Sequence, residues 1–230
     1  MWDPTFRSTG KRLETFRWNN RLHHRDKGSF CVCDDPEGRI ERVGRGPVCT
    51  VVRVRGRYVQ GGKAAAGGAE AVYDWYYFHD RPLAFVVATI TQKEPVAWHE
   101  LHALEFNYSG PTLPQWAGGE PLEQGRFDGS LKSHQGATWG VVHDGHSGLG
   151  MFACGQVLMY DGGQASYLQA HGEAAWLEWN GPRQEFTSWL WIGSDAAPVQ
   201  VVRELAKTPP AATRVSATVD EVHAHVEAAR

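Results

Sequence analysis

Short runs rich in valine and aromatic residues, separated by turn-forming pairs, constrain this sequence most. The turn pairs include Asp35-Pro36, Gly61-Gly62, Asp144-Gly145 and Gly162-Gly163. Such spacing is typical of antiparallel β-structure, because each turn lets the chain reverse and pair with the strand before it. The predicted strands cover residues 28–33, 48–58, 69–78, 83–91, 97–108, 127–130, 138–143, 148–154, 158–161, 166–170, 174–179 and 184–192.

These strands are too many for one ordinary open sheet, so we expect them to be split between two packed sheets or curled together in an all-β fold, a large antiparallel β-sandwich. The length of 230 residues suits one large β domain, which we place at residues 1–195. Residues 196–230 form a predicted C-terminal helical tail. Its short helices cover residues 198–207, where a proline occupies the first turn, and residues 219–228, where Thr218 and Glu221 have the spacing of a capping box.

Charge and hydropathy exclude several classes of partner. A net charge of −3 and a pI near 6.4 give no basic surface for nucleic acid. No stretch approaches the roughly 20 apolar residues that span a bilayer, and residues 1–12 lack the apolar centre of a signal peptide. We therefore expect a soluble chain that binds neither nucleic acid nor membrane, with a cytoplasmic location favoured.

The cysteines indicate neither a disulfide framework nor a zinc site. They are Cys31, Cys33, Cys49 and Cys154, and none forms a CxxC pair. Cys31 and Cys33 share a face of one predicted strand and are interpreted as small buried residues. The His-Glu-Leu-His sequence at 99–102 also fails as a metal motif, because its histidines are three residues apart and face opposite ways on a strand. We predict no metal and no cofactor.

The densest set of reactive side chains lies at residues 98–106. Strand alternation places Trp98, Glu100 and His102 on one face and His99 and Glu105 on the other. The first face offers an aromatic plate, a carboxylate and an imidazole that acts as acid or base near neutral pH. The alternative is an ordinary strand with its aromatic residues in the core.

A second set follows at residues 134–146. Gln135, Trp139 and His143 share a strand face, and the Asp144-Gly145 turn places His143 at the rim of the sheet. The predicted ligand-binding residues are Trp98, Trp116, Trp139, Gln135 and Arg183, and the predicted catalytic residues are Glu100, His102 and His143.

Two of these residues are predicted from other signals. Trp116 lies among prolines and glycines in a predicted loop, where a tryptophan forms a sugar platform or pins the loop. Arg183, close to Glu185, is a candidate clamp for the carboxylate of an acidic sugar, or half of an exposed ion pair. Ten tryptophans exceed what one core requires and favour a carbohydrate ligand.

The layout of residues 20–195 resembles the galactose-mutarotase-like super-sandwich superfamily. The resemblance rests on the strand segments 21–33, the turn Asp-Pro-Glu-Gly-Arg at 35–39, the Gly-Pro-Val at 46–48 that leads into an arginine-rich strand, and the closing run 184–193. Such membership implies a large β-sandwich and sugar chemistry. It does not choose between epimerases, the sandwich domains of polysaccharide lyases and non-catalytic domains of glycoside hydrolases.

Three functional interpretations remain open. The first is a domain that binds a sugar or polysaccharide on a concave sheet face. The second is an enzyme, of the aldose epimerase or polysaccharide lyase type, that uses histidine and glutamate for proton transfer and needs both groups in one pocket. The third is a structural domain that packs against another domain or subunit, for which several hundred Å² of exposed apolar sheet would be evidence.

Overall fold

Antiparallel strands form most of the regular structure. The computed structural model describes residues 5–6, 11–12, 15–109, 112–129, 133–161, 165–170 and 179–210. The strands are β1 Thr5–Phe6, β2 Lys11–Arg12, β3 Thr15–His24, β4 Gly28–Cys31, β5 Arg39–Arg45, β6 Cys49–Arg57, β7 Val59–Gln60, β8 Lys63–Ala64, β9 Glu70–Phe78, β10 Leu83–Thr91, β11 Glu100–Ser109, β12 Gln115–Gly118, β13 Glu123–Arg126, β14 Ser133–His143, β15 Ser147–Asp161, β16 Ala165–Ala170 and β17 Arg183–Ser194. The described helical elements are the 3-10 turns η1 Val32–Asp34 and η2 Ala66–Gly68 and the α-helix α1 Pro198–Lys207.

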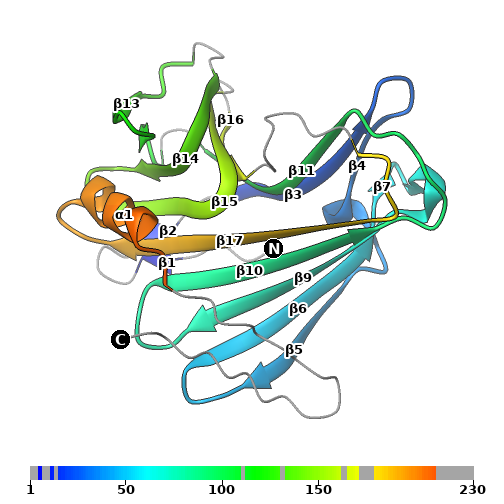
Figure 1. The fold of residues 1–230 in the computed structure, drawn as a ribbon, viewed down its shortest axis with the longest axis horizontal. Helices are drawn as coiled ribbons and strands as arrows, with labels where there is room; N and C mark the ends of the chain where they lie inside the picture. The colour runs from blue at the N-terminus through cyan, green and yellow to red at the C-terminus, as the bar shows by residue number, and fades with distance from the viewer. Residues whose placement is uncertain are drawn as a thin grey trace.

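One continuous sheet contains all of these strands except the β1–β2 pair. Its order is β5-β6-β9-β10-β17-β15-β16-β11-β3-β4-β7-β8, and β14, which pairs with β15, carries β12 and β13. In Figure 1 the sheet curls over, so that β5, β6, β9, β10 and β17 form one layer and β14, β15, β16, β11, β3 and β4 form the other. The predicted antiparallel sandwich is confirmed.

Strand β15 connects the two layers. Residues 147–152 of β15 pair with β17, and residues 157–161 pair with β16. Between these stretches Ala153 has φ 52° and Gly155 has φ 83°, which are left-handed conformations that interrupt an extended strand. The long strand therefore changes direction at this point and passes from one layer to the other.

The main core lies between β9 and β11. The ring of Trp75 meets the ring of Phe106 edge to face, with centroids 6.3 Å apart, and the Tyr73 hydroxyl donates to the Ala103 carbonyl oxygen at 2.5 Å. Alternation therefore turns Glu105, the neighbour of Phe106 in β11, to the other face of the strand, away from this core.

Helix α1 covers part of the opposite face of the sheet, next to β14 and β15 (Figure 1). The predicted helix at 198–207 is confirmed in type and bounds. Val202 is fully buried against Gly150, where a Cβ atom would lie 2.5 Å from the valine side chain. A bidentate ion pair between Arg203 and Glu120 adds a polar contact at the helix surface.

The cysteines differ from the prediction, and two predicted elements lie wholly or largely outside the described residues. Cys31 and Cys33 form a disulfide instead of two separate buried residues, because the strand ends at Cys31 and Cys33 belongs to the turn η1. Residues 174–178 of the strand predicted at 174–179, and the whole helix predicted at 219–228, fall outside the described residues. Among the described residues, no helix is long and apolar enough to cross a membrane.

Candidate functional site

A β-bulge in β11 brings together side chains that strict alternation would separate. His102 pairs with Arg21 of β3, whereas Glu105 pairs with Asn19, so β11 advances three residues while β3 advances two. The extra residue reverses the alternation beyond His102. Glu105 therefore lies on the same face as His102, and the prediction that they occupy opposite faces is wrong.

The resulting β11 cluster consists of Arg21, Glu100, His102, Glu105 and Asn107. His102 lies between two carboxylates, with Nε2 3.0 Å from an oxygen of Glu100 and Nδ1 2.5 Å from Oε2 of Glu105. The Asn107 amide donates to the other Glu105 oxygen at 2.7 Å. Arg21 Nη2 lies 3.5 Å from Glu105. Each of the five side chains thus has a partner within the cluster, although Nε of Arg21 is buried without a hydrogen-bond partner among the described residues.

Donor and acceptor counting assigns charges within the β11 cluster. A neutral imidazole has one N–H, so His102 donates to both carboxylates only as an imidazolium. The hydrogen bond from His102 lowers the pKa of Glu100. Burial alone would raise the pKa of Glu105, but His102 and Arg21 outweigh it and the net pKa is lowered. With His102 in its imidazolium form, two positive groups balance two negative groups; Nη2 of Arg21 also lies 3.1 Å from Nδ1 of His102.

Exposure divides the β11 cluster into an accessible part and a supporting part. The side chains of His102 and Glu105 are each 1% exposed, whereas those of Glu100 and Arg21 are 20% and 29% exposed. A ligand on this face can therefore touch Glu100 and Arg21, which His102 and Glu105 hold in position. Catalytic roles for Glu100 and His102 remain predictions.

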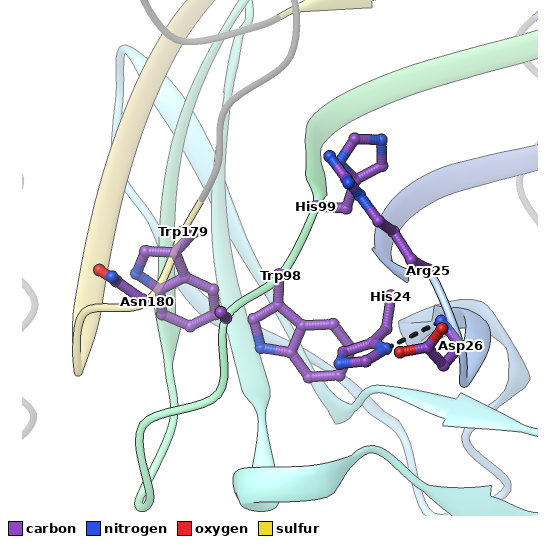
Figure 2. Close-up of a pocket in the computed structure, with 8 residues that line it drawn as sticks. His24, Arg25, Asp26, Trp98, His99, Trp179 and Asn180 are labelled. Carbon is purple, nitrogen blue, oxygen red and sulfur yellow. Dashed lines mark hydrogen bonds between the residues drawn. The ribbon is translucent and has the colours of Figure 1, made fainter.

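A cleft of about 230 Å³ lies next to the β11 cluster, at the end of the β3–β4 hairpin. Its lining consists of His24, Arg25, Asp26, Ala97, Trp98, His99, Trp179 and Asn180 (Figure 2). His99 connects the cleft with the cluster, because its Nε2 lies 3.7 Å from a carboxylate oxygen of Glu100. The cleft and the β11 cluster together are the candidate site.

The floor of the cleft is made by two tryptophans in an isolated β-bridge. The backbone N–H groups of Trp98 and Trp179 donate to each other's carbonyls at 2.7 and 3.1 Å. Trp98 is 1% exposed because its ring meets Phe30 and His24 edge to face. Its indole N–H donates to Gln92 at 3.0 Å. Trp98 therefore forms part of a packed floor instead of an exposed plate.

The rim of the cleft comes largely from the β3–β4 turn. The backbone N–H of Asp26 donates to Nδ1 of His24 at 3.1 Å, and Nε of Arg25 donates to Nδ1 of His99 at 3.3 Å (Figure 2). Because both Nδ1 atoms accept, the ring proton of each neutral imidazole is assigned to Nε2. Arg25, Asp26 and Asn180 are exposed, so the rim offers donors and an anionic acceptor to a ligand.

The second predicted set lies elsewhere in the sandwich. Trp139 is 2% exposed and packs in an apolar cluster with Phe152, Trp189 and the α1 residue Val202. His143 is buried at the end of β14, where its Nδ1 accepts from the backbone N–H of Gly145 at 3.1 Å. Desolvation lowers the pKa of His143.

Sheet register separates His143 from His102. His143 pairs with Gly148 of β15, whereas Leu104, two residues from His102, connects through Ala170 to Val157 of the same strand. Nine residues of β15 correspond to roughly 30 Å along a straight strand, before the bend at 153–155 is considered. The structure thus brings together Trp98, Glu100 and His102, but not Trp139 or His143.

The remaining predicted residues are also outside the cleft lining. Trp116 belongs to strand β12 instead of a loop, and its indole ring packs over Gly125. Arg183 is exposed and its guanidinium pairs with Glu185 at 2.5 Å. Gln135 lies in β14, but its side chain is outside the described part of the structure.

Sequence reasoning missed the turn residues His24, Arg25 and Asp26. A usable signal was present, because His23-His24-Arg25-Asp26 concentrates ionisable groups immediately before Gly28, which has the positive φ of 88° typical of a turn. Loop residues placed by a rigid sheet commonly bear function.

The comparisons with known proteins show a shared fold. No protein-family model and none of the curated proteins matches the sequence. Among solved structures, an α-galactosidase from Lactobacillus brevis aligns with 85% of this chain at 9% identity and a TM-score of 0.51. An α-mannosidase from Enterococcus faecalis V583 aligns with 84% at 10% identity and 0.51.

A third structure, a protein of glycosyl hydrolase family 38 from Enterococcus faecalis, aligns with 86% of this chain at 11% identity and a TM-score of 0.52. The alignments cover only 33%, 27% and 28% of the three longer chains. This chain therefore has the β-rich fold of a part of these glycoside hydrolases.

Proposed function

We propose that this chain is a carbohydrate-recognising domain of the galactose-mutarotase-like super-sandwich type, which binds a sugar in the cleft beside β3 and β11. The observation that carries the proposal is a cleft of about 230 Å³ with exposed hydrogen-bonding side chains, Arg25, Asp26 and Asn180, at its rim. Residues 1–195 form the recognition domain in this proposal, and residues 196–230 are its tail.

The chemistry of the cleft suits a sugar. A pyranose carries several hydroxyls that both donate and accept hydrogen bonds, and the exposed rim side chains offer complementary groups. Asp26 accepts, Arg25 donates and Asn180 does both. The volume of about 230 Å³ is below the range of roughly 300–1,000 Å³ for drug-sized ligands, which favours a single sugar unit.

The named activities of the similar structures support the same ligand class. Two of them are an α-galactosidase and an α-mannosidase, and this chain corresponds to about a third or less of their length. A part of that size fits a recognition domain that acts beside a catalytic domain. We therefore place this chain, like its proposed counterparts, next to another domain or subunit that processes the sugar.

A glycan-binding screen tests the proposal. The unmodified chain is expected to bind a subset of glycans, and Arg25→Ala, Asp26→Ala and Asn180→Ala are expected to weaken that binding. Arg81→Ala is the matched control. Arg81 is an exposed arginine just before the start of β10, and it is the opposite end of that strand that approaches the cleft. Thermal unfolding confirms that each variant is folded. If no glycan binds, or the rim variants bind like Arg81→Ala, the cleft is not a sugar site.

One observation favours a second function, proton transfer on a sugar. Glu100 is a partly exposed carboxylate next to the cleft, and it is hydrogen-bonded to the ring of His102. Such a pair can remove or return a proton during epimerisation or elimination, a role worth typically 10²–10⁴-fold in rate. Polarimetry with reducing sugars and ultraviolet detection of unsaturated products test this. Activity that survives Glu100→Gln unchanged would contradict the assignment.

A further inference from the structure

The arginine on the cleft rim differs in its surroundings from Arg21, Arg53 and Arg183. Arg21, Arg53 and Arg183 each lie within salt-bridge distance of a carboxylate. In the part of the chain that the structure describes, no carboxylate is that close to Arg25, whose hydrogen-bond partner is the imidazole of His99. Arg25 is therefore a cation available to a ligand in the cleft.

The contact with His99 fixes the guanidinium of Arg25. Its Nε atom is used by the imidazole, which leaves the two terminal Nη groups for another partner. His99 is itself fixed, because its backbone N–H donates to the His23 carbonyl at 2.8 Å and its ring lies beside Glu100. Two parallel N–H groups of an arginine match the two oxygens of a carboxylate.

We infer that the cleft takes a sugar acid, a hexuronate unit whose carboxylate binds Arg25 while its ring lies over the Trp98–Trp179 floor. This inference rests on the proposed function and names the ligand class of the same site. Asp26, the anionic rim residue, repels a carboxylate near itself and accepts from sugar hydroxyls instead. The opposed charges of Arg25 and Asp26 therefore set the direction in which the sugar acid enters.

Arg25 replaces Arg183 as the proposed clamp for the carboxylate of an acidic sugar. Arg183 is bound to Glu185, so a ligand carboxylate there would have to displace an existing partner. At Arg25 the ligand displaces only water. Available charge, not the mere presence of an arginine beside a strand, selects the position.

Matched charged and neutral ligands test the inference. Titration calorimetry would compare short oligogalacturonates with their methyl esters, and the free hexuronates with the corresponding neutral hexoses. Of the acidic sugars, the one that binds most tightly is expected to bind the unmodified protein at least about tenfold more tightly than its neutral counterpart. This is the size of effect typical of hydrogen bonds to a charged group. Arg25→Gln should abolish this preference and leave neutral-sugar affinity nearly unchanged, because the glutamine amide, unlike alanine, can still donate to a sugar hydroxyl. Arg25→Lys should retain part of it, because lysine keeps the charge without the fork.

The controls separate the two proposals. Arg81→Gln and Arg183→Gln each remove a positive charge outside the cleft lining and should leave the acid preference intact. Neutral sugars that bind with sensitivity to Asn180→Ala, but without any acid preference, would overturn this inference and leave the proposed function standing. Absence of binding by all acidic and neutral sugars would overturn both. A preference that survives Arg25→Gln would place the carboxylate elsewhere and overturn the inference.

Discussion

Trp98 and Trp139 occupy different surroundings, although their sequence contexts are alike. Trp98 precedes His99 directly and Trp139 lies four residues before His143, and both tryptophans are buried, at 1% and 2% exposure. Trp98 forms the floor of a cleft whose rim is polar, whereas Trp139 packs among apolar side chains that extend to α1. The difference shows that aromatic abundance alone does not distinguish a cleft from a packed core. The polar groups that surround an aromatic residue do so.

The ionisable groups near Trp98 and near Trp139 also have different surroundings. In the β11 cluster, carboxylates and an imidazole stabilise one another's charges. His143, near Trp139, is buried with a lowered pKa and accepts a hydrogen bond from a backbone N–H. One region keeps buried charge in balance, and the other keeps its histidine neutral. Each prediction below tests this contrast.

The largest expected effect is on the β11 cluster. Glu105→Ala should lower the free energy of unfolding by about 3–5 kcal/mol, because it leaves the charges of His102 and Arg21 without their buried partner. Urea unfolding measures the loss. Glu105→Gln, which keeps the shape and some hydrogen bonds, should cost less. If Glu105→Ala is no more destabilising than Glu185→Ala at an exposed pair, the cluster does not hold buried charge.

The next effect is at the helix that covers the Trp139 region. Gly150→Ala should lower the free energy of unfolding by about 1–3 kcal/mol, because the new methyl group would overlap Val202. Val202→Ala in the same chain should restore part of this loss, since it removes the overlapping atoms. A double-mutant cycle measures the coupling. Additive losses would show that α1 does not pack on Gly150 as described.

The two regions should lose stability in different pH ranges. The pKa of His143 is lowered in the folded state, so its contribution is complete above the unfolded value of about 6.5 and is lost as pH falls below it. The pKa of Glu100 is also lowered, so its contribution is lost only below about pH 4.3.

Urea unfolding between pH 7 and pH 3 measures both ranges, with His143→Gln and Glu100→Gln as the matched variants. His143→Gln should reduce the pH dependence of the free energy of unfolding only in the upper range, at about pH 6.5 and below. Glu100→Gln should reduce it only in the lower range, below about pH 4.3. Loss of both ranges in one variant would contradict the separation of the two regions.

Local sequence patterns account for much of the fold. Turn pairs and β-rich runs predict the antiparallel sandwich, and Pro198 with the apolar spacing of Val202 and Leu205 predicts α1. These features depend on residues a few positions apart. The number of strands predicts that they split into two sheets or curl together. The bend of β15 at Ala153, where the chain passes between layers, could not be predicted, because it depends on pairing between distant strands.

The candidate site was predictable only in part. Trp98, Glu100 and His102 were identified because reactive residue types are concentrated there. Glu105 was placed on the wrong face, because an alternation argument assumes an unbroken ladder and a bulge depends on the partner strand. Arg25 was missed for a related reason. Its importance follows from a cleft that residues 24–26, 97–99 and 179–180 form together.

The smallest expected effect concerns the exposed charges beside α1. Arg203 and Glu120 form a bidentate pair whose side chains are 29% and 45% exposed. Solvent and salt screen such a pair, so Arg203→Ala should leave unfolding unchanged at physiological ionic strength and produce at most a small loss at low salt. Thermal unfolding at two salt concentrations measures this. A salt-independent loss as large as that of Glu105→Ala would show that exposure does not distinguish the charges of the two regions, because buried and exposed pairs would then contribute alike.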